Sequence, residues 1–320
     1  MNGAQFHKFR PRFRRCVQHF RCVASRACPV FRLDANPFQG RKKQVHVVWF
    51  DPTKCGDVEL GVLPPQDVEY VHRAEEKDSR RQRLLARMVL RSTLSGYLNV
   101  RPEDIRFRIN SHGKPYLDYE SMQSTCKIDP DLRNTHFNLT HSKTMIGLAI
   151  ATGFEVGLDV EERSRIPKCG VMKFAKKKFH PKEVEYLEGL ETEGARNNRF
   201  LWLWTLKEAF VKSRGVGLYT PPGLRSFGFG FRDRDPSFVS LLGKWRMADM
   251  DAMEEYSFAV FHPSLRHLGA LCINGDSSVG IPSDVEFWEI EVDKLHNTMS
   301  GKPLGVNVVG SGVHCKELLL

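Results

Sequence analysis

The segment RFLWLWTLKEAFVKSRGVGL at 199–218 is the strongest helix signal in this 320-residue chain, and Gly215 ends it in the manner of a C-terminal cap. Residues 80–98 form a second helical pattern, with these apolar positions directed toward a core: Leu84, Leu85, Met88, Val89, Leu94 and Leu98. Short, alternating segments typical of strands fill much of the remainder, at 45–51, 105–117, 136–162, 226–233, 254–263 and 267–275. The pattern predicts an α/β (α+β) chain of two pseudo-duplicated subdomains, each a long helix followed by strands.

The charge of the chain is concentrated at its beginning. Residues 1–44 carry eleven bases against one acid, Asp34, which accounts for the whole formal net charge of +10. The neutral remainder argues against nucleic-acid binding. The Arg-rich, acid-poor leader is typical of a transit peptide, mitochondrial ahead of plastid, although a basic extension of a cytoplasmic protein would look the same. We therefore divide the chain into a leader at 1–44, subdomains at 45–153 and 154–275, and a poorly patterned, loosely attached tail at 276–320.

Simple counts argue against two further classes, membrane-spanning proteins and zinc-binding proteins. No stretch approaches the ~20 apolar residues of a membrane span. The eight cysteines form no C-x-x-C pair, so we expect scattered, reduced thiols and no zinc site.

The run VGLDVE at 156–161 places two acids on one face of an apolar strand. Because successive side chains alternate, Val156, Leu158 and Val160 face a core, while Asp159 and Glu161 face the other way. Like charges this close repel unless a base, water or a metal ion intervenes. The alternation leaves two interpretations open: an edge whose acids are paired by Lys or Arg, or a metal site.

The helix at 199–218 favours the second interpretation. Glu208 and Lys212 lie four residues apart on one face, with Trp204 one turn earlier. A partly buried glutamate near two other acids would suit Mg²⁺, which prefers few carboxylates together with phosphate oxygens. The pattern indicates phosphoryl transfer better than hydrolysis. Taken singly, His141, Lys114 and the lysines at 176–178 are ordinary structural or surface residues.

Six stretches, in order, resemble the 4′-phosphopantetheinyl transferases of the long, surfactin-synthetase-activating and aminoadipate-semialdehyde-dehydrogenase-activating type. They span roughly residues 45–275 and read LLARMVLRSTL, IRFRINSHGKPYL, FNLTHSKTMIGLAIA, VGLDVEE, KKKFHPKEVEYL and WLWTLKEAFVKSRGVGL. The resemblance implies a monomer with an active site in the cleft between two subdomains, each with a small antiparallel sheet. It also implies transfer of 4′-phosphopantetheine from coenzyme A to a serine of an apo acyl or peptidyl carrier protein, with release of 3′,5′-ADP.

The same resemblance implies roles for individual residues. Asp159, Glu161 and Glu208 would hold Mg²⁺, and Glu208 would also draw the proton from the serine. Lys212, its catalytic partner, and Lys207 would contact phosphates.

Four more residues would contact coenzyme A. His141 would reach its 3′-phosphate, helped by Thr140, where many relatives have serine. Lys114 would lie near the nucleotide. Arg83 is the candidate for the basic residues that relatives place ahead of the first helix, although its spacing departs from their pattern. The basic run at 173–182 is a docking candidate for the acidic helix of a carrier protein.

Three alternatives stay open from the residues alone: a catalytically silent carrier-binding module, a different Mg²⁺-dependent phosphotransferase, and a nucleic-acid-binding protein. The clustered acids speak against the first, the absence of a G-x-x-x-x-G-K-[ST] loop against a nucleotide triphosphatase, and the neutral body against the third. Which carrier protein is the substrate stays undecided.

Overall fold

The computed structural model describes eight ranges of the chain, which are 44–55, 63–217, 223–232, 235–242, 254–276, 284–293, 298–303 and 307–314. The predicted leader, apart from Gln44, lies outside these ranges, and its targeting role stays a prediction. All four cysteines within these ranges are free thiols, as expected: Cys55, Cys126, Cys169 and Cys272. Among the described helices, none combines the length and hydrophobicity needed to cross a membrane.

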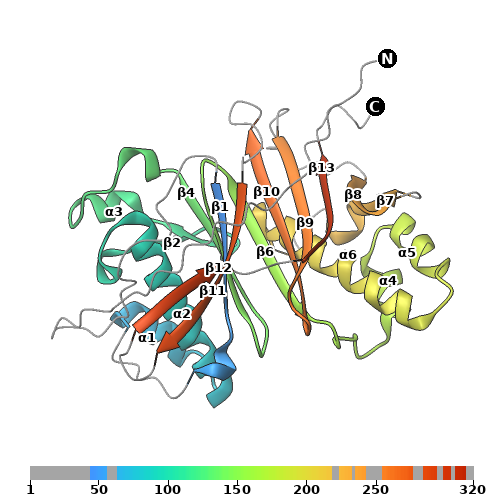
Figure 1. Ribbon diagram of the computed structural model, residues 1–320, viewed down its shortest axis with the longest axis horizontal. Coiled ribbons are helices and arrows are strands. Elements are labelled where there is room, and N and C mark those ends of the chain that lie inside the picture. Colours follow the sequence, from blue (N-terminus) through green and yellow to red (C-terminus); the bar gives the residue numbers. More distant parts are fainter. Residues whose placement is uncertain are drawn as a thin grey trace.

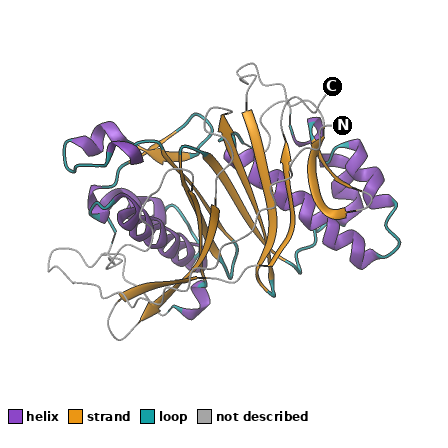
Figure 2. Ribbon diagram, turned by 45° about the horizontal axis from the view of Figure 1, so that its top comes forward, coloured by secondary structure: helices purple, strands orange, loops and turns teal. Residues whose placement is uncertain are grey.

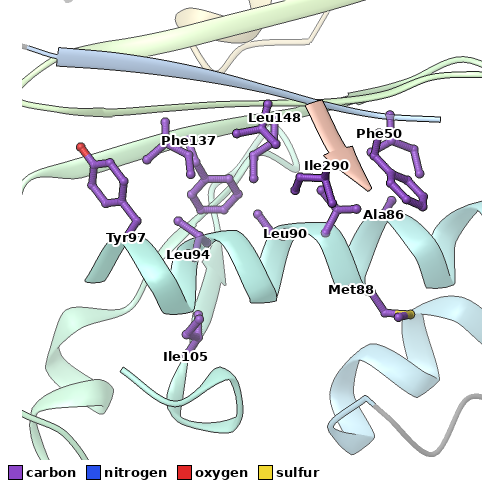
Figure 3. Packing of buried hydrophobic residues seen from close by; sticks show 14 of the residues in the cluster. Phe50, Ala86, Met88, Leu90, Leu94, Tyr97, Ile105, Phe137, Leu148 and Ile290 are labelled. Carbon is purple, nitrogen blue, oxygen red and sulfur yellow. The ribbon is translucent and has the colours of Figure 1, made fainter. Parts of the chain in front are cut away.

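The first part of the chain builds a sheet covered by one long helix. Among the described residues the sheet has five strands in the order β12-β11-β1-β5-β4. They are β12 (Thr298–Pro303), β11 (Asp284–Asp293), β1 (Gln44–Phe50), β5 (Ile146–Thr152) and β4 (Thr135–His141). The predicted apolar residues of helix α2 (Lys77–Leu98) are buried in one core together with residues of this sheet. In Figure 3, Leu90, Leu94 and Tyr97 point toward the strands, whereas Met88 points away from them. The helix ends at Asn99, whose φ of 54° lies in the left-handed region.

Smaller elements surround α2. Helix α1 (Pro65–His72) packs beside it, and buried Arg91 of α2 is paired with Asp67 of α1. A hairpin of β2 (Phe107–Ile109) and β3 (Pro115–Leu117) follows, and then the short helix α3 (Tyr119–Gln123).

The second part repeats the arrangement of a sheet and a long helix. Its six described strands have the order β6-β10-β9-β13-β8-β7. They are β6 (Glu155–Glu162), β10 (His267–Asp276), β9 (Glu254–Ser264), β13 (Asn307–His314), β8 (Asp235–Leu242) and β7 (Gly228–Arg232). Helix α6 (Glu193–Ser213) lies along β6 and β10, with α4 (Val171–Lys178) and α5 (Pro181–Glu188) beside it. The predicted proline at the start of α5 and the predicted end of α6 near Gly215, at φ 65°, are confirmed.

The two sheets face each other between the two long helices, as Figures 1 and 2 show. The core between them includes Val47 and Trp49 from β1, Val156 and Leu158 from β6, and Phe261 from β9. Strands β4 and β6 are edge strands of the two sheets and lie beside each other. Their contact brings the ends of β4 and β6 together with α6, and this junction is where the candidate site forms.

The interpretation of 276–320 as a loosely attached tail is wrong. Strand β11 pairs in parallel with β1, and β13 pairs with β9, so this segment contributes to both sheets. Most strand pairs are antiparallel, as expected, but β1–β11 and β8–β13 are parallel. The change from one sheet to the other falls between β5 and β6, and the pseudo-duplication stays a prediction.

Candidate functional site

Strand β6 presents its two acids to helix α6, as the alternating pattern predicted. Val156, Leu158 and Val160 are buried in the core between the sheets. On the opposite face a side chain at Gly157 would overlap the backbone of Ala209 and Ser213 in α6. Only glycine allows this close approach, so the helix packs directly on the face that carries the acids.

The end of β4, strand β6 and helix α6 together line an open cavity of about 680 Å³. Six of the predicted site residues share it: Thr140, His141, Asp159, Glu161, Glu208 and Lys212. The other lining residues are Leu139, Ser142, Lys143, Val160, Glu162 and Arg165. The structure thus brings most of the predicted site together from segments that are far apart in the sequence.

Asp159 lies at the centre of a polar cluster. The Lys212 ammonium donates to its Oδ1 at 2.6 Å and to the Thr140 hydroxyl at 3.2 Å. The Thr140 hydroxyl donates in turn to the same Asp159 oxygen at 3.3 Å. The other oxygen, Oδ2, is buried and finds no hydrogen-bond partner within the described ranges. A buried carboxylate oxygen of this kind is a vacant acceptor position.

Glu161 is held from two sides. The indole Nε1 of Trp204 donates to its Oε1 at 2.9 Å, and the Arg165 guanidinium forms an ion pair with the same oxygen. The Arg165 cation also lies over the Trp204 ring, 5.3 Å from the centroid. Trp204, predicted to share the face of Glu208 and Lys212, therefore orients one of the strand's acids.

Two lining groups have displaced pKa values. Burial, and then the nearby charge of Asp159, raises the pKa of Glu208 to about 7, although Lys212 and Arg165 oppose the shift. The pKa of His141 is lowered by burial and then by the positive charges of Lys212 and Arg83. Both displacements follow first from burial, and the neighbouring charges in the site add to it or oppose it.

The three predicted metal ligands do not form a ready-made site. In the described part of the chain no group of three His, Cys, Asp or Glu side chains is arranged to hold a metal ion. The two acids of β6 are instead neutralised by Lys212 and Arg165, as the alternative of acids paired by bases required. The joint binding of Mg²⁺ by Asp159, Glu161 and Glu208 stays a prediction.

Lys207 was expected to contact phosphate, and this assignment is wrong. Its side chain is completely buried on another side of α6, where it lies 2.9 Å from the Glu183 carboxylate. It also donates to the carbonyl oxygens of Leu224 at 2.9 Å and Phe227 at 2.6 Å. Adjacent helical residues point about 100° apart, which separates Lys207 from Glu208.

Two other predicted contacts lie away from the lining of the cavity. Lys114 reaches the end of α6, where its ammonium donates to the Ser213 carbonyl at 3.0 Å, and its expected place beside the nucleotide stays a prediction. Arg83 donates to the Tyr70 carbonyl at 3.1 Å and lies 5.1 Å from the centroid of that ring. Its charge is close enough to lower the pKa of His141, and its contact with coenzyme A stays a prediction.

Sequence reasoning missed Arg165 and Lys143. Arg165 follows Glu161 by four residues, but it lies in the loop after β6, where that spacing carries no structural meaning. A second small network lies beside Glu162, one of the lining residues: the Thr144 hydroxyl donates to Glu162 at 2.9 Å and contacts His267 Nε2 at 2.8 Å. No motif in the sequence points to it.

Two family models match the chain, one after the other. Residues 51–153 match "4′-phosphopantetheinyl transferase, N-terminal" and residues 155–261 match "4′-phosphopantetheinyl transferase superfamily". The second range contains both acids of β6 and all of α6, and the first contains Thr140 and His141.

Curated proteins give the same answer. The 4′-phosphopantetheinyl transferase HetI of Nostoc sp. (strain PCC 7120 / SAG 25.82 / UTEX 2576) is 33% identical over 173 residues, which are 54% of this chain and 67% of that protein. The L-aminoadipate-semialdehyde dehydrogenase-phosphopantetheinyl transferase of Mus musculus is 28% identical over 159 residues, 49% of each chain. Matches to two further bacterial proteins extend over 65% and 55% of their length, so the chain spans about half to two thirds of these relatives.

Among solved structures, a holo-(acyl-carrier-protein) synthase from Bacillus anthracis str. Ames, in complex with CoA (3′,5′-ADP), aligns at 21% identity with a TM-score of 0.31. The alignment covers 38% of this chain and 96% of that one, and it is too partial to carry a structural comparison. The family models and the curated relatives identify the chain without it: it belongs to the 4′-phosphopantetheinyl transferase superfamily.

Proposed function

We propose that this protein is a holo-[acyl-carrier-protein] synthase, which transfers 4′-phosphopantetheine from coenzyme A to a serine hydroxyl of an apo carrier protein. The observation that carries the proposal is the cavity in which the carboxylates of Asp159, Glu161 and Glu208 lie together with Lys212 and His141, in a chain of this family. A site that combines acids and cations in this way suits a phosphorylated substrate whose charge changes during reaction.

The residues of the cavity fit a divalent cation. The Oδ2 of Asp159 is buried and has no hydrogen-bond partner within the described ranges, so it offers an open acceptor position, and Glu161 and Glu208 line the same space. Hard carboxylate oxygens are the ligands that Mg²⁺ takes in phosphoryl-transfer sites. Bound there, Mg²⁺ would neutralise the pyrophosphate of coenzyme A and the charge that develops on transfer.

The reaction forms one bond and breaks one. The serine oxygen attacks the β-phosphorus of coenzyme A, and the bond from that phosphorus to the bridging oxygen breaks, so that 3′,5′-ADP leaves with the bridging oxygen. We assign Glu208 to accept the serine proton, a contribution of about 10²–10⁴-fold for a well-placed base. Lys212, which already reaches Asp159 and Thr140, would stabilise negative charge on the phosphates. His141, at the exposed end of β4, would receive the 3′-phosphate.

A docking role for the basic run at 173–182 belongs to the same proposal. Lys173, Lys177 and Lys182 are exposed on α4 and α5, whereas Lys176 lies 2.8 Å from Glu188. These charges would steer an acidic carrier helix toward the site, which would affect the association rate and its salt dependence.

Mitochondrial import through the leader is proposed separately, and fusion of residues 1–44 to a fluorescent protein would test it.

The deciding experiment is the intact mass of an apo carrier protein after incubation with the full chain, coenzyme A and Mg²⁺. We expect a gain of one phosphopantetheine, which Glu208→Gln loses and Glu185→Gln, a change of an exposed glutamate on α5, retains. No gain with fatty-acid, polyketide, peptide and aminoadipate-type carriers, despite measured binding of coenzyme A, would refute transfer and favour a carrier-binding module.

A further inference from the structure

The C-terminal end of α6 is completed by residues from the other half of the molecule. The last carbonyls of a helix have no partner within the helix. Just after the helix, the backbone amide of Gly215 donates to the carbonyl oxygen of Lys212, and that of Val216 donates to the carbonyl oxygen of Val211, each at 3.2 Å. The carbonyl oxygens of Ser213 and Gly215 are instead directed to the β2–β3 hairpin, where they accept hydrogen bonds from Lys114 and Asn110.

The donors come from a turn that is rigid in itself. The side-chain oxygen of Asn110 accepts from the backbone amides of His112 and Lys114, both at 2.9 Å. The backbone N–H of Asn110 donates to the backbone carbonyl of Lys114 at 3.0 Å. Between these two residues, Gly113 has a φ of 88°. Asx-type bonds of this kind fix the shape of a turn before it contacts anything else.

The turn then makes two bonds to α6. The Asn110 Nδ2 donates to the Gly215 carbonyl at 2.8 Å, and the Lys114 ammonium donates to the Ser213 carbonyl at 3.0 Å. Lys114 also lies 3.8 Å from the carboxylate of Glu155, the first residue of β6. One lysine therefore contacts the end of the helix and the start of the strand that line the cavity.

The β2–β3 turn packs closely against Gly215, and the positive charge of Lys114 suits the C-terminal end of a helix. A Cβ atom on Gly215 would lie 3.0 Å from the Lys114 side chain and 3.1 Å from that of Asn110, so the turn is seated directly on this glycine. A positive charge at a helix C-terminus interacts favourably with the helix dipole. The side chain of Lys114 is only 16% exposed, so its charge is directed at the helix end and not at solvent.

We propose that Asn110 and Lys114 form a latch on the C-terminal turn of α6, and that they are positioning residues for the transfer reaction. Lys212 directly precedes Ser213, whose carbonyl the latch holds, and Glu208 lies one turn earlier in the same helix. Fixing the helix end fixes where the Lys212 ammonium meets Asp159. This inference rests on the proposed function for its kinetic consequence, but the latch itself is a structural claim.

Kinetics of Lys114→Met and Asn110→Ala test the consequence, at a temperature well below each variant's unfolding midpoint. We expect kcat to fall about 10- to 100-fold, since misplacement by about an ångström has effects of this size, while KM for coenzyme A changes by less than about twofold. Arg108→Met is the matched control: it removes a positive charge from the same hairpin, where Arg108 is paired with Asp118 and Glu120, and should leave kcat unchanged. A rise in KM for coenzyme A at constant kcat would overturn the proposal, because it would make Lys114 a nucleotide contact.

Hydrogen exchange tests the latch without reference to activity. The amides of Arg214, Gly215 and Val216 are hydrogen-bonded in the last turn, and we expect them to exchange faster in both variants than in the wild type and in Arg108→Met. Unchanged exchange would overturn the latch even if the wild type transfers phosphopantetheine. A wild type without transfer activity but with the expected exchange would refute the proposed function alone.

Discussion

Replacement of Lys207 by methionine should destabilise the protein strongly without acting on the cavity. Lys207 and Glu183 are both completely buried and lie 2.9 Å apart, and the ammonium is also 4.3 Å from the centroid of the Phe227 ring. Methionine keeps much of the length and apolar volume of the lysine side chain, so the substitution removes chiefly the charge and its hydrogen bonds.

The structure sets the size of the effect. Removing one partner of a buried ion pair leaves an uncompensated charge, at a typical cost of about 3–5 kcal/mol. Here the carbonyls of Leu224 and Phe227 also lose a donor. Glu183 keeps two backbone donors, the amides of His180 at 2.9 Å and Phe229 at 2.8 Å, which limits the cost. With an unfolding entropy of about 2.1 cal/mol/K per residue, a loss of about 3–5 kcal/mol corresponds to a fall in melting temperature of roughly 4–7 °C for a chain of 320 residues.

The deficit should depend on pH with a definite sign. In the wild type, burial raises the pKa of Glu183, and the charge of Lys207 opposes that shift. Without Lys207 the pKa of Glu183 rises further. A carboxyl group whose folded-state pKa lies above its unfolded value of about 4.3 favours the folded state at low pH, and this contribution is lost as pH rises through the folded pKa. The variant should therefore come closest to the wild type in acid and fall furthest behind it in alkaline buffer.

Thermal unfolding followed by circular dichroism at pH 5, 6.5 and 8 measures both effects. Lys176→Met is the control, because Lys176 is 62% exposed in its pair with Glu188 and should change stability by less than about 1 kcal/mol. The double variant Glu183→Gln/Lys207→Met should recover part of the loss. If Lys207→Met keeps the wild-type melting temperature and raises KM for coenzyme A, the reasoning is refuted and Lys207 is a phosphate contact after all.

Three further outcomes are expected. Gly157→Ala should lower the free energy of unfolding by about 1–3 kcal/mol, since the new Cβ overlaps the backbone of Ala209, and an unchanged denaturation midpoint would contradict the packing of α6 on β6. Asp159→Asn should weaken Mg²⁺ binding in calorimetry by about tenfold or more, because even outer-shell partners of metal ligands have effects of that size, and equal affinity would remove Asp159 from the metal site. Chelation with EDTA should stop transfer and added Mg²⁺ should restore it, whereas EDTA-resistant transfer would argue against a metal in the reaction.

The sequence predicted the structure best where a short local pattern was compatible with only one arrangement of the backbone and side chains. In VGLDVE the period of two decides which side chains share a face, and the structure places Asp159 and Glu161 opposite the buried Val156, Leu158 and Val160. The ends of elements were equally well marked, by Gly153 between β5 and β6 and by Gly215 after α6, both at positive φ. These features depend on neighbouring residues alone.

Strand β11 could not be found in this way. One of its two neighbours is β1, from the opposite end of the described chain, and these two strands are parallel. Its apolar residues are divided between two cores, Phe287 between the sheets and Trp288 beside α2, so no alternation is visible. Two of the intervening acids are paired only in the folded protein, Glu286 with His46 at 3.5 Å and Glu289 with Lys54 at 3.0 Å.

The neighbours Lys207 and Glu208 show why a motif does not by itself assign roles. Both lie in α6, which is apolar on most sides, so the periodicity of the helix does not select a single buried face. One signal was nevertheless present: at i−4 and i+3 from Lys207 the sequence has Leu203 and Phe210, both fully buried, whereas Glu208 has Trp204 and Lys212 at i−4 and i+4. A lysine between apolar neighbours is expected to be buried and paired, and a glutamate between an indole and a lysine is expected at the edge of a polar site. The neighbours one turn away in the helix therefore distinguish the two residues: Lys207 stabilises the fold, and Glu208 lines the cavity.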